Sequence, residues 1–190
     1  MEKSVEKKKT LFTTKQMTLI GVMTAVICIL GPFVIPLPFS PVPISFTNLA
    51  IYFTVYVLGA KLGTISYLIY LLLGCAGLPV FSGFTGGFAK LAGPTGGYLV
   101  GFIFMAVMAG YFVEKFPGKI VMHVMGMVLG TIVCYIFGTV WLSNQLGIPF
   151  VAGLGAGVIP YLPGDIAKII LAVMAGPKLR REVLRATGVN

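Results

Sequence analysis

One pair of residues in this sequence could bind a polar ligand within an otherwise apolar segment. Asp165 and Lys168 lie at positions i and i+3, so a helix would place both side chains on one face. Pro163 is typical of a helix start, and the helix dipole favours an aspartate in the first turn. Burying ionisable groups at membrane depth is costly, and such residues usually mark a functional site. We therefore interpret the pair as a ligand contact, with a purely structural ion pair as the alternative.

Two further groups of residues could contact the same ligand. Ser45, Thr47 and Asn48 bring neutral hydrogen-bonding groups to the start of another apolar stretch, although helix capping would explain one of them. A glycine-rich loop and its end carry the remaining candidates, which are Phe84, Phe88, Lys90 and Tyr98. The aromatic side chains could equally form an interfacial belt, and the lysine could equally anchor to lipid headgroups.

Few residues remain for other kinds of chemistry. His123 is the sole histidine and is interpreted as a packed residue rather than a ligand. The sequence lacks a G-x-x-x-x-G-K-[ST] phosphate loop, so it cannot hydrolyse ATP through that motif. The cysteines lack the close spacing of a zinc or disulfide motif and are interpreted as buried apolar side chains; they are Cys28, Cys75 and Cys134. We therefore expect neither enzymatic activity nor a bound metal or cofactor.

The composition indicates what kind of fold must position these residues. Of 190 residues, 57% are hydrophobic and only 10% are charged, whereas a soluble domain carries about a quarter charged residues. A membrane-spanning helix needs roughly 20 apolar residues. Six stretches approach this length: residues 17–35, 44–60, 62–80, 97–113, 120–142 and 159–175. The sequence therefore predicts an all-α integral membrane protein with six transmembrane helices.

The distribution of basic residues predicts the orientation of this bundle. Twelve of the 14 lysines and arginines fall in the tails and loops on one side, which is cytoplasmic by the positive-inside rule. Both termini are then cytoplasmic, in a multi-pass protein of the bacterial plasma membrane. The predicted divisions are a basic tail (1–16), a six-helix membrane domain (17–176) and a basic C-terminal tail (177–190). The net charge of +9 fits anionic lipid headgroups better than nucleic acid.

The loops on the opposite side are apolar and rich in proline or glycine. Residues 36–43 contain four prolines and predict a stiff, extended segment. The glycine-rich segments 82–97 and 153–157 are expected to fold over the helix ends and line a cavity, where irregular backbone is tolerated. By contrast, the short connector 59–63 predicts an antiparallel helical hairpin.

Small residues spaced four apart allow helices to approach one another closely. Gly126 and Gly130 are expected to serve packing within the bundle. Gly21 and Ala25 follow the basic tail and are predicted to form a docking surface for a partner protein.

Several of these motifs together resemble the BioY family of biotin transporters. They are Pro-Val-Pro-Ile-Ser at 41–45, Gly-Leu-Pro-Val-Phe-Ser-Gly at 77–83, Leu-Ala-Gly-Pro-Thr-Gly-Gly-Tyr at 91–98 and the D-x-x-K element at 165–168. The resemblance implies the six-helix S component of an energy-coupling factor (ECF) transporter, which binds biotin near the external side. Such a protein pairs with a transmembrane coupling subunit and two cytoplasmic ATPases. The family's A-x-x-x-A contact maps onto Gly21 and Ala25, with glycine at the first position.

The resemblance also gives the candidate residues specific roles. Asp165 is expected to accept a hydrogen bond from a ureido N–H of biotin, while Lys168 donates to the ureido carbonyl or keeps the carboxylate ionised. Asn48 and Ser45 would complete the polar shell, and Thr47 stands where the family often has glutamine. The aromatic candidates would pack on the apolar ring, and Lys90 or the backbone of residues 93–97 would meet the ligand carboxylate. The alternatives are an S component for another vitamin, such as thiamin or riboflavin, or a structural or channel-like subunit.

Overall fold

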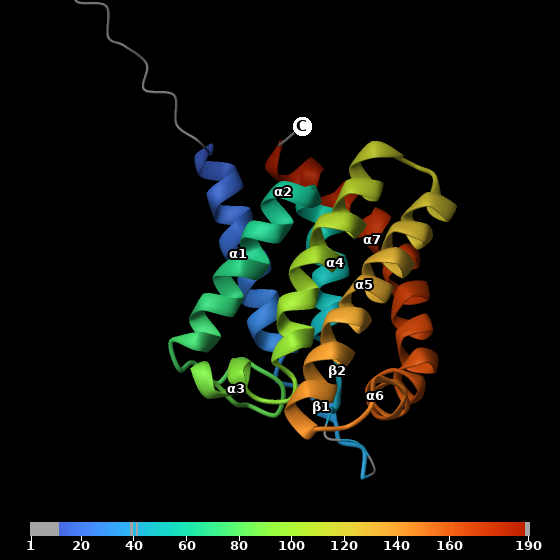
Figure 1. The fold of residues 1–190 in the computed structure, drawn as a ribbon. Helices are drawn as coiled ribbons and strands as arrows, with labels where there is room; N and C mark the ends of the chain where they lie inside the picture. The colour runs from blue at the N-terminus through green and yellow to red at the C-terminus, as the bar shows by residue number, and fades with distance from the viewer. Residues whose placement is uncertain (1–11, 39, 41, 189–190) are drawn as a thin grey trace, which may run out of the picture.

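The structure, a computed structural model, describes residues 12–38, 40 and 42–188. Residues 1–11 of the predicted basic tail lie outside this set. Long helices form a bundle, and the short elements gather at one end of it (Figure 1). The elements are α1 (Thr14–Leu30), β1 (Val34–Ile35), β2 (Ile44–Ser45), α2 (Thr47–Cys75), α3 (Phe88–Ala92), α4 (Gly96–Lys115), α5 (Ile120–Leu146), α6 (Phe150–Gly157), the 3-10 helix η1 (Ile159–Tyr161) and α7 (Leu162–Thr187). We call the end with β1, β2, α3 and α6 the hairpin end and the opposite end the basic end.

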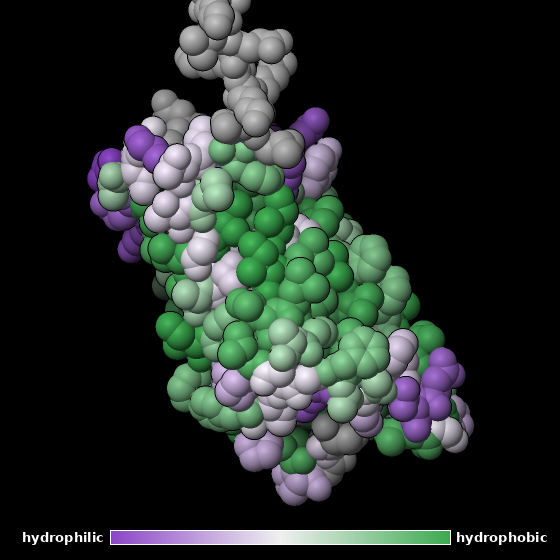
Figure 2. All heavy atoms as spheres, turned by 90° about the vertical axis from the view of Figure 1, so that its left-hand side faces the viewer, coloured by the Kyte–Doolittle hydropathy of each residue, from purple (hydrophilic) through white to green (hydrophobic). Residues whose placement is uncertain are grey.

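The long helices are apolar enough to cross a membrane. In the described part of the chain this holds for α2, α4, α5 and the segment Phe150–Thr187, while α1 is a shorter apolar helix. Figure 2 shows a broad apolar face on the side of the bundle, with polar groups concentrated toward its two ends. The predicted all-α membrane fold is confirmed. The count of six crossings and the cytoplasmic position of the termini stay predictions.

The predicted helical hairpin forms within α2. The helix is broken at Gly59, whose φ of 76° belongs to a region that glycine adopts readily. Beyond the break the chain reverses, and a Cβ on Gly63 would lie 3.2 Å from the Cα of Val55. The two arms therefore run side by side, as the cyan and green parts of α2 show in Figure 1. At the end of the first arm, Arg180 Nη1 of α7 donates to the carbonyl oxygen of Tyr56 over 3.1 Å, so that one free helix-end carbonyl is satisfied.

The hairpin end differs from the prediction in two places. The first helix ends at Leu30, not near residue 35, because Pro32 has no backbone N–H to continue the helical hydrogen bonds. The chain then forms β1, which pairs with β2 in antiparallel fashion, so the predicted extended segment is the loop of a β-hairpin. In the predicted glycine-rich loop 153–157 the chain forms α6.

At the basic end, α7 continues through Pro177 to Thr187, so residues 177–187 of the predicted tail are helical. His123 is buried there, and its ring nitrogens bond to the Tyr56 hydroxyl at 3.2 Å and to the carbonyl oxygen of Phe116 at 2.8 Å. Its interpretation as a packed residue is confirmed.

Candidate ligand-binding site

The predicted ion pair faces the interior of the bundle at the start of α7. Asp165 and Lys168 are each only 8% exposed, and Lys168 Nζ lies 3.0 Å from Asp165 Oδ1. The same ammonium donates to the carbonyl oxygen of Ser45 over 2.7 Å, which ties α7 to β2. Burial of two charges is costly unless they are paired and hydrogen-bonded, and both conditions are met here.

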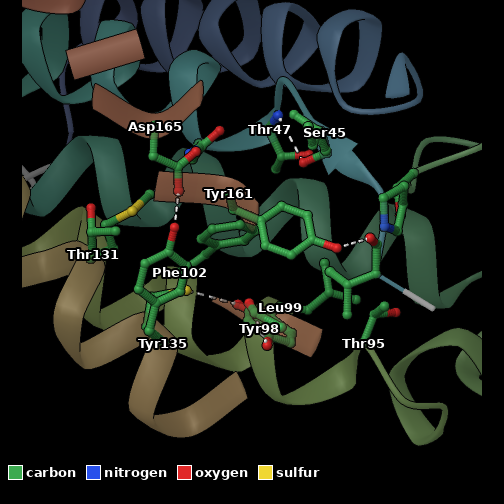
Figure 3. A pocket seen from close by; sticks show the side chains of 18 of the residues that line it. Ser45, Thr47, Thr95, Tyr98, Leu99, Phe102, Thr131, Tyr135, Tyr161 and Asp165 are labelled. Atoms are coloured by element: carbon green, nitrogen blue, oxygen red, sulfur yellow. Dashed lines mark hydrogen bonds between the residues drawn. The ribbon is translucent and has the colours of Figure 1, made fainter. Parts of the chain in front are cut away.

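Three helices converge on the Asp165 carboxylate. Asn48 Nδ2, from the first turn of α2, donates to Oδ1 over 2.8 Å, and this oxygen also accepts from Lys168. The hydroxyl of Tyr135 on α5 donates to the other oxygen, Oδ2, as the dashed line in Figure 3 shows. Hydrogen bonds to an ionised acceptor are the stronger kind. The carboxylate is therefore held in one orientation by donors on both of its oxygens.

A cavity of about 70 Å³ adjoins the ion pair. This is several times the roughly 10–15 Å³ that a single water needs, so the cavity is larger than a packing gap. Asp165, Lys168 and Asn48 line its polar end. On α4, Leu99, Phe102 and Met105 give the cavity an apolar wall. A ligand with a polar head and an apolar body would match these two surfaces.

Hydroxyl groups line the cavity away from the ion pair. Tyr98 donates to the carbonyl oxygen of Gly157 over 2.9 Å, and Tyr161 shares its one hydroxyl proton between Ser40 Oγ, at 2.6 Å, and the carbonyl oxygen of Val42. In turn, Ser40 Oγ donates to the carbonyl oxygen of Ala156 over 2.7 Å. These bonds join the β-hairpin loop to α6 and close the cavity on this side.

Most of the predicted site residues come together at this cavity. Those that line it are Asp165, Lys168, Asn48, Ser45, Thr47 and Tyr98. Ser45 contributes mainly through its backbone carbonyl, while its Oγ accepts from the Thr47 N–H over 3.3 Å.

Three predicted residues lie outside the cavity lining. Phe84 is 62% exposed and Phe88 69% exposed. A turn, bridged between Phe81 and Thr85, directs Phe84 outward, where its ring packs edge-on against Phe33. Lys90 lies on α3, and partial burial lowers the pKa of its ammonium group. The structure does not bring these three side chains to the ion pair.

Sequence reasoning missed Tyr135, which bonds directly to Asp165. A tyrosine within an apolar span resembles an ordinary core residue. Its neighbours gave a signal, since Thr131, Tyr135 and Thr139 recur every four residues and share one face of α5. That face points inward, because Thr131 and Thr139 are buried.

The predicted docking residues lie on the outer face of α1. Gly21 and Ala25 are exposed and line an apolar groove together with Ile65 and Ile69 of the second arm of α2. A Cβ on Gly21 would meet no atom within 4 Å. By contrast, Gly126 packs directly against Phe112, as expected of a glycine that serves packing within the bundle.

This chain is similar to known proteins both in sequence and in fold. The sequence matches the BioY family over residues 3–185. The biotin transporter BioY of Rhizobium etli is 36% identical over 173 residues, which cover 86% of this chain and 92% of that protein. The biotin transporter BioY of Lactococcus lactis subsp. cremoris is 37% identical over 174 residues, covering 88% and 92%. A crystal structure of the S-component for biotin from an ECF-type ABC transporter matches with a TM-score of 0.82 at 36% identity, covering 90% of this chain and 95% of that one.

Proposed function

This chain belongs to the BioY family, and from that premise we infer that it is the biotin-binding S component of an ECF-type ABC transporter. It is a transport subunit of the membrane and not an enzyme. The observation that carries the proposal for its site is the buried Asp165–Lys168 pair beside a cavity in the bundle. Since this pair is the polar end of the cavity, it is where the polar end of a ligand would bind.

The fused ureido ring of biotin fits this polar end. A ureido group has two N–H donors and one carbonyl acceptor, so Asp165 can accept from an N–H while Lys168 donates to the carbonyl. Asn48 holds the carboxylate from the side, and Ser45 holds the ammonium. The thioether ring and the methylene chain would pack against Leu99 and Phe102 on the apolar wall. The proposed contacts rest on the six predicted residues that line the cavity, together with Tyr135.

Calorimetric titration of biotin into the purified, detergent-solubilised protein tests this function. We expect saturable binding at one site and a rise in Tm, because a ligand that binds only the folded state stabilises it by mass action. Thiamin and riboflavin serve as comparison ligands in the same thermal-shift experiment. A larger shift with either of them would reassign the vitamin, and the absence of any response to biotin would refute the proposal.

Replacing Tyr135 with phenylalanine is expected to weaken biotin binding by about tenfold. The substitution removes the hydrogen bond from the Tyr135 hydroxyl to the Asp165 carboxylate. A hydrogen bond to an ionised acceptor contributes about 1.5 kcal/mol or more, and 1.4 kcal/mol is a factor of ten in affinity. Since Tyr135 acts through Asp165, the loss should vanish when Asp165 is already asparagine. Titration calorimetry on the single and double variants measures this coupling. Tyr111→Phe, on the exposed face of α4, is the matched control. Full additivity of the two losses would contradict a positioning role.

We further propose that the chain assembles with a transmembrane coupling subunit and two cytoplasmic ATPases. The groove on α1 is the surface that supports this proposal, because its walls are apolar and Gly21 leaves room for close approach of another helix. Basic residues at the end of the bundle opposite the cavity would face the ATPases if that end is cytoplasmic. They include Lys61, Lys115, Lys119 and Arg181.

Replacing Gly21 with tryptophan is expected to abolish co-purification with the coupling subunit while leaving biotin affinity within twofold. The indole would fill the groove, which lies on the outside of α1 and away from the cavity lining. Co-purification from membranes with tagged coupling subunit provides the measurement. Val22→Trp is the matched control, since this exposed residue of the same helix does not line the groove. Assembly of Gly21→Trp at the level of the unmodified protein would show that the partner docks elsewhere.

A further inference from the structure

Most of the hydrogen-bonding capacity of the ion pair is used within the protein. A carboxylate can accept about four hydrogen bonds, and an ammonium group can donate three. Asn48 and Lys168 donate to Oδ1 of the Asp165 carboxylate, and Tyr135 donates to Oδ2. The Lys168 ammonium also donates to the carbonyl oxygen of Ser45. One acceptor position on the carboxylate and one N–H of the ammonium therefore remain for a ligand.

A ligand head that matches this remainder has an N–H and a carbonyl oxygen side by side and carries no charge. Neighbouring N–H and carbonyl groups are the arrangement in a urea. Among the described residues that line the cavity, Asp165 and Lys168 carry the formal charges, and they neutralise each other at 3.0 Å. A third charge buried beside them would lose its water without gaining a counterion.

A cyclic guanidine has the shape of a cyclic urea but the opposite hydrogen-bonding character at one position. In 2-iminobiotin an imino group replaces the ureido oxygen of biotin. A guanidine is protonated at neutral pH, and a guanidinium has N–H donors and no acceptor. The remaining N–H of Lys168 would then meet another donor, and two positive charges would lie together among apolar side chains.

We propose that Lys168 determines the specificity of the site for the ligand head. Its ammonium group selects a neutral cyclic urea and rejects the cyclic guanidinium of the same shape. This inference deepens the proposed function and rests on it, because it takes the ureido ring as the group bound by the ion pair.

Removal of the ammonium group should reverse this selectivity. In a Lys168→Met protein the Asp165 carboxylate keeps its bonds from Asn48 and Tyr135, so each of its oxygens has an acceptor position free. A guanidinium can fill both positions with two parallel N–H bonds, which is the strong geometry for pairing with a carboxylate. The ligand would thus supply the cation that the substitution removed.

Titration calorimetry and thermal shift with biotin and 2-iminobiotin, at neutral pH on the purified full chain, test the inference. The two ligands have the same tail, so the contributions of Ser82, Thr95 and the start of α4 to tail binding cancel in the comparison. The unmodified protein should bind biotin about a hundredfold or more tightly than 2-iminobiotin. Lys168→Met should bind 2-iminobiotin about tenfold or more tightly than biotin and gain more in Tm from it.

Two further variants show where the selectivity comes from. Lys178→Met makes the same change on the exposed part of α7 and should keep the preference for biotin. The double variant Asp165→Asn with Lys168→Met has no carboxylate to pair with the guanidinium, so it should lose the preference for 2-iminobiotin. If the double variant kept that preference, the cation would bind elsewhere and the inference would be wrong.

The unmodified protein alone can also overturn the inference, without any variant that has to fold. Binding of 2-iminobiotin as tightly as biotin would mean that Lys168 does not select against the cation, while the proposed function would stand. A folded Lys168→Met protein that still prefers biotin would show that another group selects the urea. If neither ligand produces heat or a change in Tm, the proposed function fails as well.

Discussion

Biotin affinity is expected to fall roughly ten- to hundredfold when Asp165 is replaced by asparagine. A hydrogen bond to an ionised acceptor is worth about 1.5–3 kcal/mol, and each 1.4 kcal/mol is a factor of ten in affinity. The amide would also turn an N–H₂ group toward the donors of Asn48, Tyr135 or Lys168, which now all point at a carboxylate. Titration calorimetry measures the loss, and circular dichroism shows whether the helical fold is retained.

The same helix provides a matched control for this substitution. Glu182 lies on α7 toward the basic end, with its side chain 67% exposed and paired with Arg185. Glu182→Gln therefore makes the same chemical change in water, where an ion pair contributes little. Its biotin affinity should equal that of the unmodified protein. Equal affinity in a folded Asp165→Asn protein would instead mean that the ion pair serves only to hold the bundle together.

The features that could be predicted from the sequence are those set by local patterns. Long apolar stretches predicted the helices, and the i, i+3 spacing after a proline placed Asp165 and Lys168 together on one face of α7. The short connector 59–63 predicted the reversal of the chain, and the structure places the break at Gly59, whose positive φ suits glycine. Each of these conclusions depends on residues within a few positions of one another.

The features that could not be predicted depend on residues far apart in the chain. Asn48 and Asp165 are 117 positions apart, and Tyr135 and Asp165 are 30 apart, so only the packing of α2 and α5 around α7 brings them together. The β-hairpin was missed because two strands of two residues have no periodicity to detect. Likewise α6 was expected to be a loop, because glycine disfavours helix. In the structure Gly153 and Gly157 let this helix lie against Ser143 and Tyr98, and tertiary packing outweighs that preference.

Replacing Lys168 with methionine is expected to lower both stability and biotin affinity. Methionine keeps the length of the side chain but removes the charge, so the Asp165 carboxylate stays buried with no cation beside it. Removing one partner of a buried ion pair typically costs about 3–5 kcal/mol. The protein should therefore unfold at a markedly lower Tm in detergent, and biotin should lose the donor to its ureido carbonyl. Lys178→Met, on the exposed part of the same helix, should change neither quantity.

The double variant Asp165→Asn with Lys168→Met separates the two roles of the pair. With no charge left to bury, the Tm should recover most of the loss seen in Lys168→Met, because the penalty belongs to the unpaired carboxylate and not to the missing amine. Biotin affinity should not recover, since both groups that bind the ureido ring are gone. A pair whose only role is structural would regain every measured property once its charges are removed together. Recovery of stability without recovery of binding is therefore the result that only a ligand-binding ion pair can give, and recovery of both would refute that role.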